Sequence, residues 1–153
     1  MNQYPIKAKA EMLIRKPVAE VFEAFINPEI TSKFWFTKGS GRLQKGAHIQ
    51  WDWEMFGVSA QVDVQDIVPN QRIFIAWDDN ASVEWLFTAR ADNETFVSIT
   101  NAGFTGTDEE IIAQALDATE GFTLVLCGAK AFLEHNIRLN LTADRFPDAV
   151  VEH

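Results

Sequence analysis

Cysteine is nearly absent from this sequence, and long apolar runs do not occur. Because Cys127 is the only cysteine among 153 residues, no internal disulfide can form, which fits a reducing compartment. No stretch approaches the roughly 18 uninterrupted apolar residues of a membrane helix, and residues 1–9 lack the charged-then-apolar build of a signal peptide. We therefore expect a cytoplasmic protein without membrane insertion, in which Cys127 is a buried small hydrophobe rather than a reactive thiol.

Basic residues are also scarce. The chain carries 13 lysines and arginines against 22 aspartates and glutamates, a formal net charge of −9. No basic stripe interrupts this distribution, so the surface is expected to repel a phosphate backbone or an anionic membrane. We expect no nucleic acid among the partners of this protein.

The motifs of catalytic and metal sites are missing as well. The three histidines, His48, His135 and His153, do not have metal-ligand spacing, and neither HExxH nor CxxC occurs. Gly39-Ser40-Gly41 lacks the third glycine and the following helix of a nucleotide-binding loop. Nothing marks a nucleophile beside a histidine and an orienting acid. The sequence predicts no catalytic residue, no metal site and no cofactor.

Apolar residues, in contrast, make up 47% of the chain and are distributed over its whole length. A chain of this length normally forms one domain with one core, and no polar linker divides it. We expect a single domain over residues 1–153, in which a tail from about residue 140 follows the last long helix.

The first part of the chain predicts a strand and two short helices. Residues 6–14 have the alternation of a strand, and Lys16-Pro17 opens a helix with proline at its first position, where the missing N–H costs nothing. An apolar stripe at helical spacing runs to Phe25. Asn27-Pro28 ends this helix and begins a second one that reaches Phe34-Trp35.

The middle of the chain alternates with a period of two residues, which is typical of half-buried antiparallel strands. Five strands are expected, at residues 48–54, 58–65, 72–77, 83–90 and 97–101, with turns such as Pro69-Asn70 and Asp78-Asp79-Asn80 between them. The side chains predicted to face inward are Ile49, Trp51, Trp53, Val58, Ala60, Val62, Val64, Trp77, Val83, Trp85, Phe87, Ala89, Val97, Ile99 and Asn101.

The last third of the chain is predicted to be helical. Residues 107–110, Thr-Asp-Glu-Glu, have the form of a capping box, which marks the start of a helix. The apolar run at 111–118 meets Gly121, where we expect a break or a bend, and the longest helix follows. Its apolar stripe comprises Phe122, Leu126, Ala129, Leu133 and Ile137.

A long helix with one apolar stripe must lay that stripe on the apolar face of the sheet. The sheet then has to curl around the helix. The expected fold class is therefore α+β, a curved antiparallel sheet wrapped around a long C-terminal helix, with two short helices after the first strand. This arrangement is the helix-grip fold.

Several blocks of residues, in their order along the chain, carry a resemblance to a known family: 14–22, Phe34-Trp35, 95–104, Gly121-Phe122 and 131–134. The sequence resembles the activator of ninety-kilodalton heat-shock protein ATPase homologue family, within the START-like (SRPBCC) or polyketide-cyclase superfamily. It departs from the pattern in having Phe122 where tryptophan is usual, and in the tail after residue 140. The resemblance implies a helix-grip cavity open to small hydrophobic molecules, in proteins that act as lipid or aromatic-ligand binders, cochaperones or cyclases.

Aromatic residues are abundant, with five tryptophans and twelve phenylalanines. Rings this bulky are hard to pack solidly on a curved sheet, so we expect an apolar cavity of roughly 300 Å³ or more; the alternative is that the rings fill the core. Asn101 either orients the polar group of a ligand or hydrogen-bonds a neighbouring backbone group. The candidate ligand-binding residues are Trp35, Trp51, Trp53, Trp77, Trp85, Phe87, Ile99, Asn101, Phe122, Leu126, Ala129 and Leu133.

Three functions follow as hypotheses. The first is the binding of a small hydrophobic molecule, of lipid or aromatic type, between the sheet and the C-terminal helix, which predicts a dry and sizeable cavity. The second is a cochaperone-like protein-interaction module, whose partner is a chaperone or another protein and which needs an exposed patch. The third is an enzyme of cyclase or hydrolase type, which needs a perturbed ionisable group in the cavity wall. Both a monomer and a homodimer fit the sequence.

Overall fold

The strands of this protein form one antiparallel sheet of seven strands in the order β1-β7-β6-β5-β4-β3-β2. The computed structural model describes residues 6–78 and 81–151, so residues 79–80 of the predicted turn at Asp78-Asp79-Asn80 lie outside the described part. The strands are β1 (Ala8–Ile14), β2 (Lys38–Gly39), β3 (His48–Trp53), β4 (Val58–Val68), β5 (Arg72–Trp77), β6 (Ala81–Ala91) and β7 (Glu94–Ala102).

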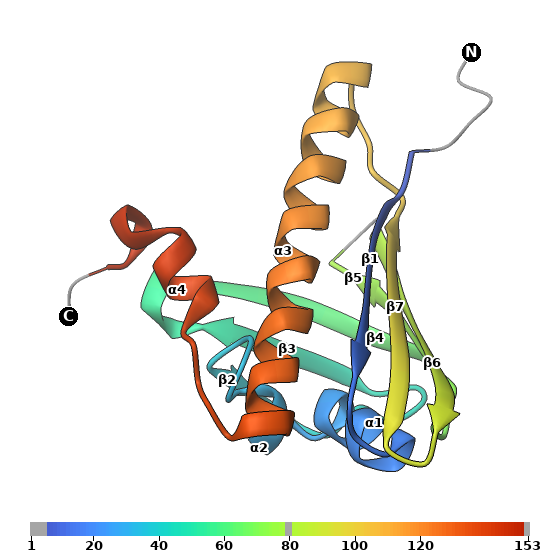
Figure 1. Ribbon diagram of the computed structural model, residues 1–153. Helices are drawn as coiled ribbons and strands as arrows, with labels where there is room; N and C mark the ends of the chain where they lie inside the picture. The colour runs from blue at the N-terminus through green and yellow to red at the C-terminus, as the bar shows by residue number, and fades with distance from the viewer. Residues whose placement is uncertain (1–5, 79–80, 152–153) are drawn as a thin grey trace.

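The sheet curls into a half-barrel, and a long helix near the C-terminus, α3 (Asp108–His135), closes its open side (Figure 1). This helix runs beside the edge strand β1, with which it makes its most extensive contact. The predicted helix-grip class, a curved sheet around a long C-terminal helix, is confirmed. The remaining helical elements are α1 (Val18–Ile26), α2 (Pro28–Thr31), α4 (Leu141–Arg145) and the 3₁₀ turns η1 (Glu54–Phe56) and η2 (Pro147–Ala149).

Side chains alternate between the inner and outer faces along most of the sheet, and this alternation fails near strand ends. Register shifts occur between Val64 and Asp66 in β4 and between Ala89 and Ala91 in β6. Such irregularities bend a strand and change which face a side chain takes. Ala89 is exposed and Val58, the first residue of β4, is 52% exposed, so the inward predictions for these two residues are wrong.

The two short helices lie in tandem after β1, as predicted, with one difference in each. The second was expected to reach Phe34-Trp35, but α2 ends at Thr31, so that expectation is wrong. Pro17 is the N-cap residue of α1 rather than its first helical residue, and its φ of −59° with ψ of 147° is extended. The missing N–H is harmless at either position. Asn27 ends α1 and caps α2, because its side chain accepts a hydrogen bond from the N–H of Glu29.

Helix α3 begins at the predicted capping box and continues without interruption to His135. Thr107 Oγ1 accepts a hydrogen bond from the N–H of Glu110, whose carboxylate accepts one from the N–H of Thr107. The break expected at Gly121 is therefore wrong. A glycine in a helix interior costs only about 1 kcal/mol relative to alanine, and the burial of neighbours such as Phe122 and Val125 outweighs that.

Replacing Gly121 with alanine is expected to raise the free energy of unfolding by about 0.5–1 kcal/mol, because alanine restricts the unfolded chain and favours the helix. A Cβ at this position meets nothing within 4 Å. Gly128→Ala is the matched control: its Cβ would lie 3.1 Å from the backbone oxygen of Phe34, so its gain should be smaller or reversed. Urea unfolding of both variants measures the difference, and equal effects would contradict this account.

By length and composition, α3 qualifies as a helix that could cross a membrane, a property shared by core helices of soluble proteins. Its second half buries Phe122, Leu126 and Ala129 within the hydrophobic core. We therefore interpret α3 as the core helix of this fold.

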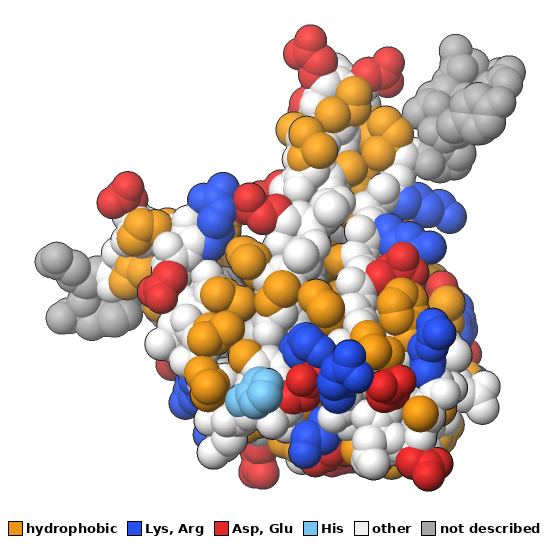
Figure 2. Space-filling view, viewed as in Figure 1, with side chains coloured by type: hydrophobic (Ala, Val, Ile, Leu, Met, Phe, Trp, Pro, Cys, Tyr) orange, Lys and Arg blue, Asp and Glu red, His pale blue; other side chains and the backbone are white. Residues whose placement is uncertain are grey.

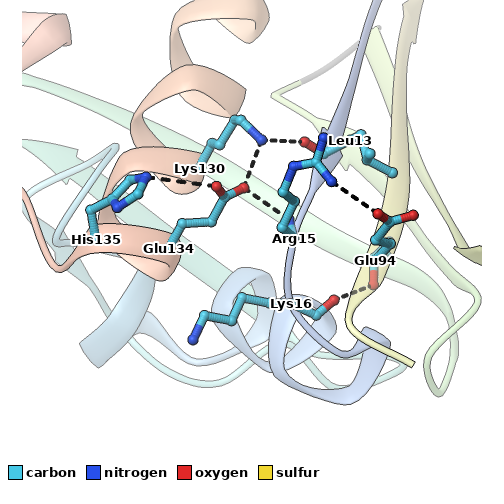
Figure 3. A network of polar contacts seen from close by, with 8 residues as sticks. Leu13, Arg15, Lys16, Glu94, Lys130, Glu134 and His135 are labelled. Carbon is cyan, nitrogen blue, oxygen red and sulfur yellow. Dashed lines mark hydrogen bonds and ion pairs between the residues drawn. The ribbon is translucent and has the colours of Figure 1, made fainter. Parts of the chain in front are cut away.

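A polar network fixes the C-terminal end of α3 to the sheet (Figure 3). The Glu134 carboxylate accepts hydrogen bonds from the N–H of Arg15 at 2.8 Å and from Lys130 Nζ at 2.6 Å. Lys130 Nζ also donates to the carbonyl of Leu13 at 2.8 Å. Burial raises the pKa of Glu134, but these hydrogen bonds together lower it below its ordinary value of 4.5. The charged carboxylate thus stabilises the contact between α3 and β1.

Glu134→Gln is expected to lower the free energy of unfolding by about 1–2 kcal/mol at pH 7, because its side chain is only 9% exposed and its partners lose a charged acceptor. A folded-state pKa below the unfolded one stabilises the protein above the unfolded value of 4.5, and this stabilisation is lost as the pH falls through the folded pKa. Denaturation at several pH values should therefore show the two proteins converging in acid. Glu11→Gln, in an exposed pair with Lys9, should change stability little at any pH.

Candidate ligand cavity

A cavity of about 370 Å³, partly open to solvent, lies between the middle of α3, the ends of several strands and α4. Three parts of the chain that are distant in sequence build its wall. The lining residues are Trp35, Trp53, Trp77, Ala81, Asn101, Phe104, Gln114, Asp117, Ala118, Gly121, Phe122, Leu124, Val125, Thr142 and Phe146.

The sheet side of the cavity is aromatic. Trp53 and Trp77 are the last residues of β3 and β5, and their ring centroids are 6.0 Å apart; Trp35 follows α2 and packs against both. The centroid of the Trp35 ring lies 6.0 Å from that of Trp53 and 5.8 Å from that of Trp77. The position of α1 and α2 thus places Trp35 inside the curved sheet, in contact with Trp53 and Trp77.

The helix side presents one face of α3. Gln114, Asp117, Ala118, Gly121 and Val125 recur at intervals of three and four residues, the spacing of a single helical face. Small side chains at 118 and 121 leave room for the cavity. Asp117 brings the only charged side chain of the described lining, and it is exposed at the rim.

The C-terminal tail supplies the third side through Thr142 and Phe146. Arg145 Nε donates to Glu120 on α3 at 2.7 Å, and the N–H of Val151 donates to the carbonyl of Met55 at 2.8 Å. These contacts tie the tail to α3 at residue 145 and to η1 at residue 151, so the segment that follows α4 runs from one to the other.

The structure brings five of the predicted site residues to the cavity and places seven elsewhere. Trp35, Trp53, Trp77, Asn101 and Phe122 line it. Six others are buried in the core without lining the cavity: Trp51, Trp85, Phe87, Ile99, Leu126 and Ala129. Leu133 is half-buried and packs on that core.

Asn101 makes the backbone hydrogen bond that one of its two interpretations predicted, and it also lines the cavity. Its side chain is 8% exposed, and Nδ2 donates to the carbonyl of Ser82 at 2.9 Å. This bond fixes the amide while Asn101 still lines the cavity. Trp85 is different: its indole N–H is buried without a hydrogen-bond acceptor among residues 6–78 and 81–151, surrounded by the rings of Phe25, Trp35 and Phe122.

Sequence reasoning missed the lining residues that precede Phe122 in α3 and those of the tail. The expected break at Gly121 separated Gln114, Asp117 and Ala118 from the helix that covers the sheet. A continuous helical stripe through residue 121 is the signal that finds them. Thr142 and Phe146 carry no such signal, because the five residues of α4 are too few for a periodic pattern.

Acid–base and metal chemistry have little support in the described residues. No group of three or more His, Cys, Asp or Glu side chains that could hold a metal ion occurs there. His48 lies on the exposed face of β3, where a hydrogen bond with Asp63 at 2.6 Å raises the pKa of its imidazole. His135 is exposed at the end of α3, and His153 lies outside the described residues.

A second cleft of about 220 Å³ adjoins the first and shares Trp35 and Thr142 with it. Its wall includes two basic side chains, Lys33 and Arg138, together with polar residues of the segment between α3 and α4. The two hollows on either side of Trp35 therefore differ in the sign of their charge.

Residues 15–134 match the sequence profile of the family described as Activator of Hsp90 ATPase homolog 1-like protein. The chain belongs to this family. The match begins just after β1, covers α1 to β7 and nearly all of α3, and ends before the tail that carries Thr142 and Phe146. Among curated proteins, none matches the chain significantly.

Several solved structures share the fold of this chain. The Staphylococcus saprophyticus protein SSP2350 is 26% identical with a TM-score of 0.76, over 88% of this chain and 96% of that one. The Aha1 dimer from Colwellia psychrerythraea is 18% identical with a TM-score of 0.71, over 85% of this chain and 97% of that one. DynU16, from the dynemicin biosynthetic locus, is 18% identical with a TM-score of 0.71, over 86% of this chain but only 48% of its own.

Proposed function

We propose that this protein binds a small hydrophobic molecule, of lipid or aromatic type, in the cavity between α3, the sheet and α4. The observation that carries the proposal is a hollow of about 370 Å³ whose wall includes three tryptophans and three phenylalanines. This volume falls within the roughly 300–1,000 Å³ of small-molecule sites, which combine apolar walls with a few polar groups. Asn101, Gln114 and Thr142 supply those groups.

One structural neighbour and the packing beneath the cavity support this proposal. DynU16 comes from a biosynthetic locus, a setting in which small molecules are made. In the present chain, Trp51 and Trp85 beneath the cavity are each 1% exposed, so the cavity lies against a densely buried core. A localised hollow above a dense core is what a preformed binding site requires.

Native mass spectrometry of the purified protein tests the proposal. We expect a non-covalent mass that disappears on denaturation, and extraction then identifies its chemical class. A native mass equal to that of the chain alone, unchanged after incubation with a panel of lipids and aromatic compounds, would overturn it.

A protein-interaction role of cochaperone type is the second candidate, and one surface favours it. The first turns of α3 extend beyond β1 and β7 (Figure 1) and carry apolar side chains beneath an acidic end (Figure 2). Ile112 is 46% exposed and Leu116 is 68% exposed on this part. Pull-down with a ninety-kilodalton heat-shock protein tests this role. Loss of capture in Leu116→Glu, with Ala118→Trp unaffected, would support it over the cavity.

We also propose a cytoplasmic location, a single domain over residues 1–153 and either a monomer or a homodimer, the latter being the state of the Colwellia psychrerythraea neighbour. The third class, a cyclase or hydrolase, has Asp117 as its one ionisable group in the described cavity wall. Because Asp117 is exposed, it lacks the desolvation that tunes a catalytic carboxyl. The binder is therefore the function that we place first.

A further inference from the structure

We propose that the cavity selects a ligand whose buried end is a compact, alkylated ammonium group, and that it excludes carboxylates. This inference rests on the proposed function and names the ligand class for the same site. It follows from two properties of the wall, its charge and the inclination of its rings.

The charge of the wall is negative. Asp117 is its one charged residue among those described, and no ion pair of Asp117 occurs within residues 6–78 and 81–151. The nearest cation in sequence to the tail wall, Arg145, is paired with Glu120 at 2.7 Å. A carboxylate entering this cavity would find no cationic side chain among the described lining residues, and the nearby Arg145 already has Glu120 as its partner, so the carboxylate would lose hydration without full compensation. A cation, in contrast, has a counter-charge in Asp117 at the rim.

The rings of the wall suit a rounded group better than a flat one. Trp35 is inclined at 70° to Trp53 and at 66° to Phe122, and Trp77 is inclined at 83° to Phe122. Trp77 is closer to parallel with the other two tryptophans, at 31° to Trp35 and 39° to Trp53, so the steep inclinations are those made by Trp35 and Phe122. A planar polycycle is held best between parallel rings, while steeply inclined rings form a box. Aromatic boxes of this type attract ammonium groups, because the negative face of each ring stabilises the positive charge, with tryptophan the strongest.

One ring of the wall, that of Phe146, already makes a cation–π contact with a side chain of the same protein, Arg145. The guanidinium carbon of Arg145 lies 4.6 Å from the centroid of the Phe146 ring, within the range of a cation–π contact. The neighbouring cleft has the opposite character, since Lys33 and Arg138 line it. Anionic ligands are therefore expected at that cleft and cations at the aromatic cavity.

Equilibrium dialysis with three compounds of similar shape tests the inference: benzyltrimethylammonium, its neutral isostere neopentylbenzene, and phenylacetate. We expect the ammonium compound to bind roughly tenfold more tightly than the isostere, and phenylacetate to bind more weakly than both. Asp117→Asn should weaken the ammonium compound several-fold and leave the isostere unchanged. Glu109→Gln, which removes an exposed carboxylate in the first turn of α3, is the matched control and should change neither.

A further variant separates the rings from the carboxylate. Trp77→Leu keeps an apolar wall but removes one ring face, so it should weaken the ammonium compound more than the isostere. Equal binding of the ammonium compound and the isostere would overturn the inference while the proposed hydrophobic site remains. If Ala118→Trp leaves the binding of all three compounds unchanged, the cavity is not the site, and both the inference and the proposed function are overturned.

Discussion

Ala118→Trp is expected to abolish ligand binding while the protein stays folded. Ala118 lies on α3 at the cavity wall and is half-buried, so an indole at this position projects from the helix into empty space. We expect affinity to fall at least about 100-fold, equivalent to ~2.7 kcal/mol. Overpacking of a filled core costs about 1–3 kcal/mol, but here the new side chain occupies a void, so the melting temperature should change little.

Ala113→Trp is the control for this experiment. Ala113 is exposed and is absent from the cavity wall, so the same substitution one and a half turns earlier adds an indole to the surface of α3. Native mass spectrometry and equilibrium dialysis should show normal binding in this variant. Retention of ligand by Ala118→Trp, at full occupancy, would place the binding site elsewhere in the molecule.

Trp51→Ala is expected to have the largest effect on stability, lowering the free energy of unfolding by about 3–5 kcal/mol. Trp51 is 1% exposed and stacks on Phe36 with ring centroids 4.9 Å apart and an interplanar angle of 19°. The Trp77 ring meets it edge-on at 5.5 Å. Truncation leaves a void among these rings, which cannot collapse because the sheet fixes their Cα positions. Urea unfolding measures the loss.

Phe146→Ala provides the comparison for Trp51, because Phe146 is an aromatic residue of the cavity wall that is 39% exposed. Its truncation should lower stability by less than about 1 kcal/mol, in line with the loss of a partly exposed contact. It should nevertheless weaken ligand binding, since the tail wall loses its ring. If the two substitutions destabilise the protein equally, the separation of core from cavity is contradicted.

The fold was predictable from the sequence because apolar and polar residues alternate regularly along its strands. Ile49, Val62 and Val83 face the core as the period of two required, and the capping box at Thr107 marked the first turn of α3. These signals are local, and each agrees with the global arrangement. Local signals failed at Val58 and Ala89, near irregular ends of strands, and at the end of α2. They failed at Gly121 for the opposite reason, because α3 stays regular where a glycine suggested a break.

The cavity was predictable only in part. The alternation of apolar and polar residues along a strand shows which side chains face the interior, but not whether an inward side chain lies in the packed core or at the cavity wall. Trp51 and Trp53 have the same parity in β3, yet Trp51 belongs to the dense core and Trp53 to the cavity wall. The difference depends on how far along the curled sheet each ring lies from α1 and α2. Residues such as Phe146 reach the wall through long-range contacts of the tail, which no local pattern encodes.

The tail forms a part of the cavity wall in which substitutions could change the proposed ligand site. The family profile ends at residue 134, yet Thr142 and Phe146 form part of the cavity wall. Substitutions at Trp51 or Val62 threaten the folding of the whole chain, whereas the tail contributes few buried residues and is under weaker constraint from folding. In the proposed binding role, substitutions in the last residues could therefore alter the cavity wall while the sheet and α3 stay unchanged as the scaffold.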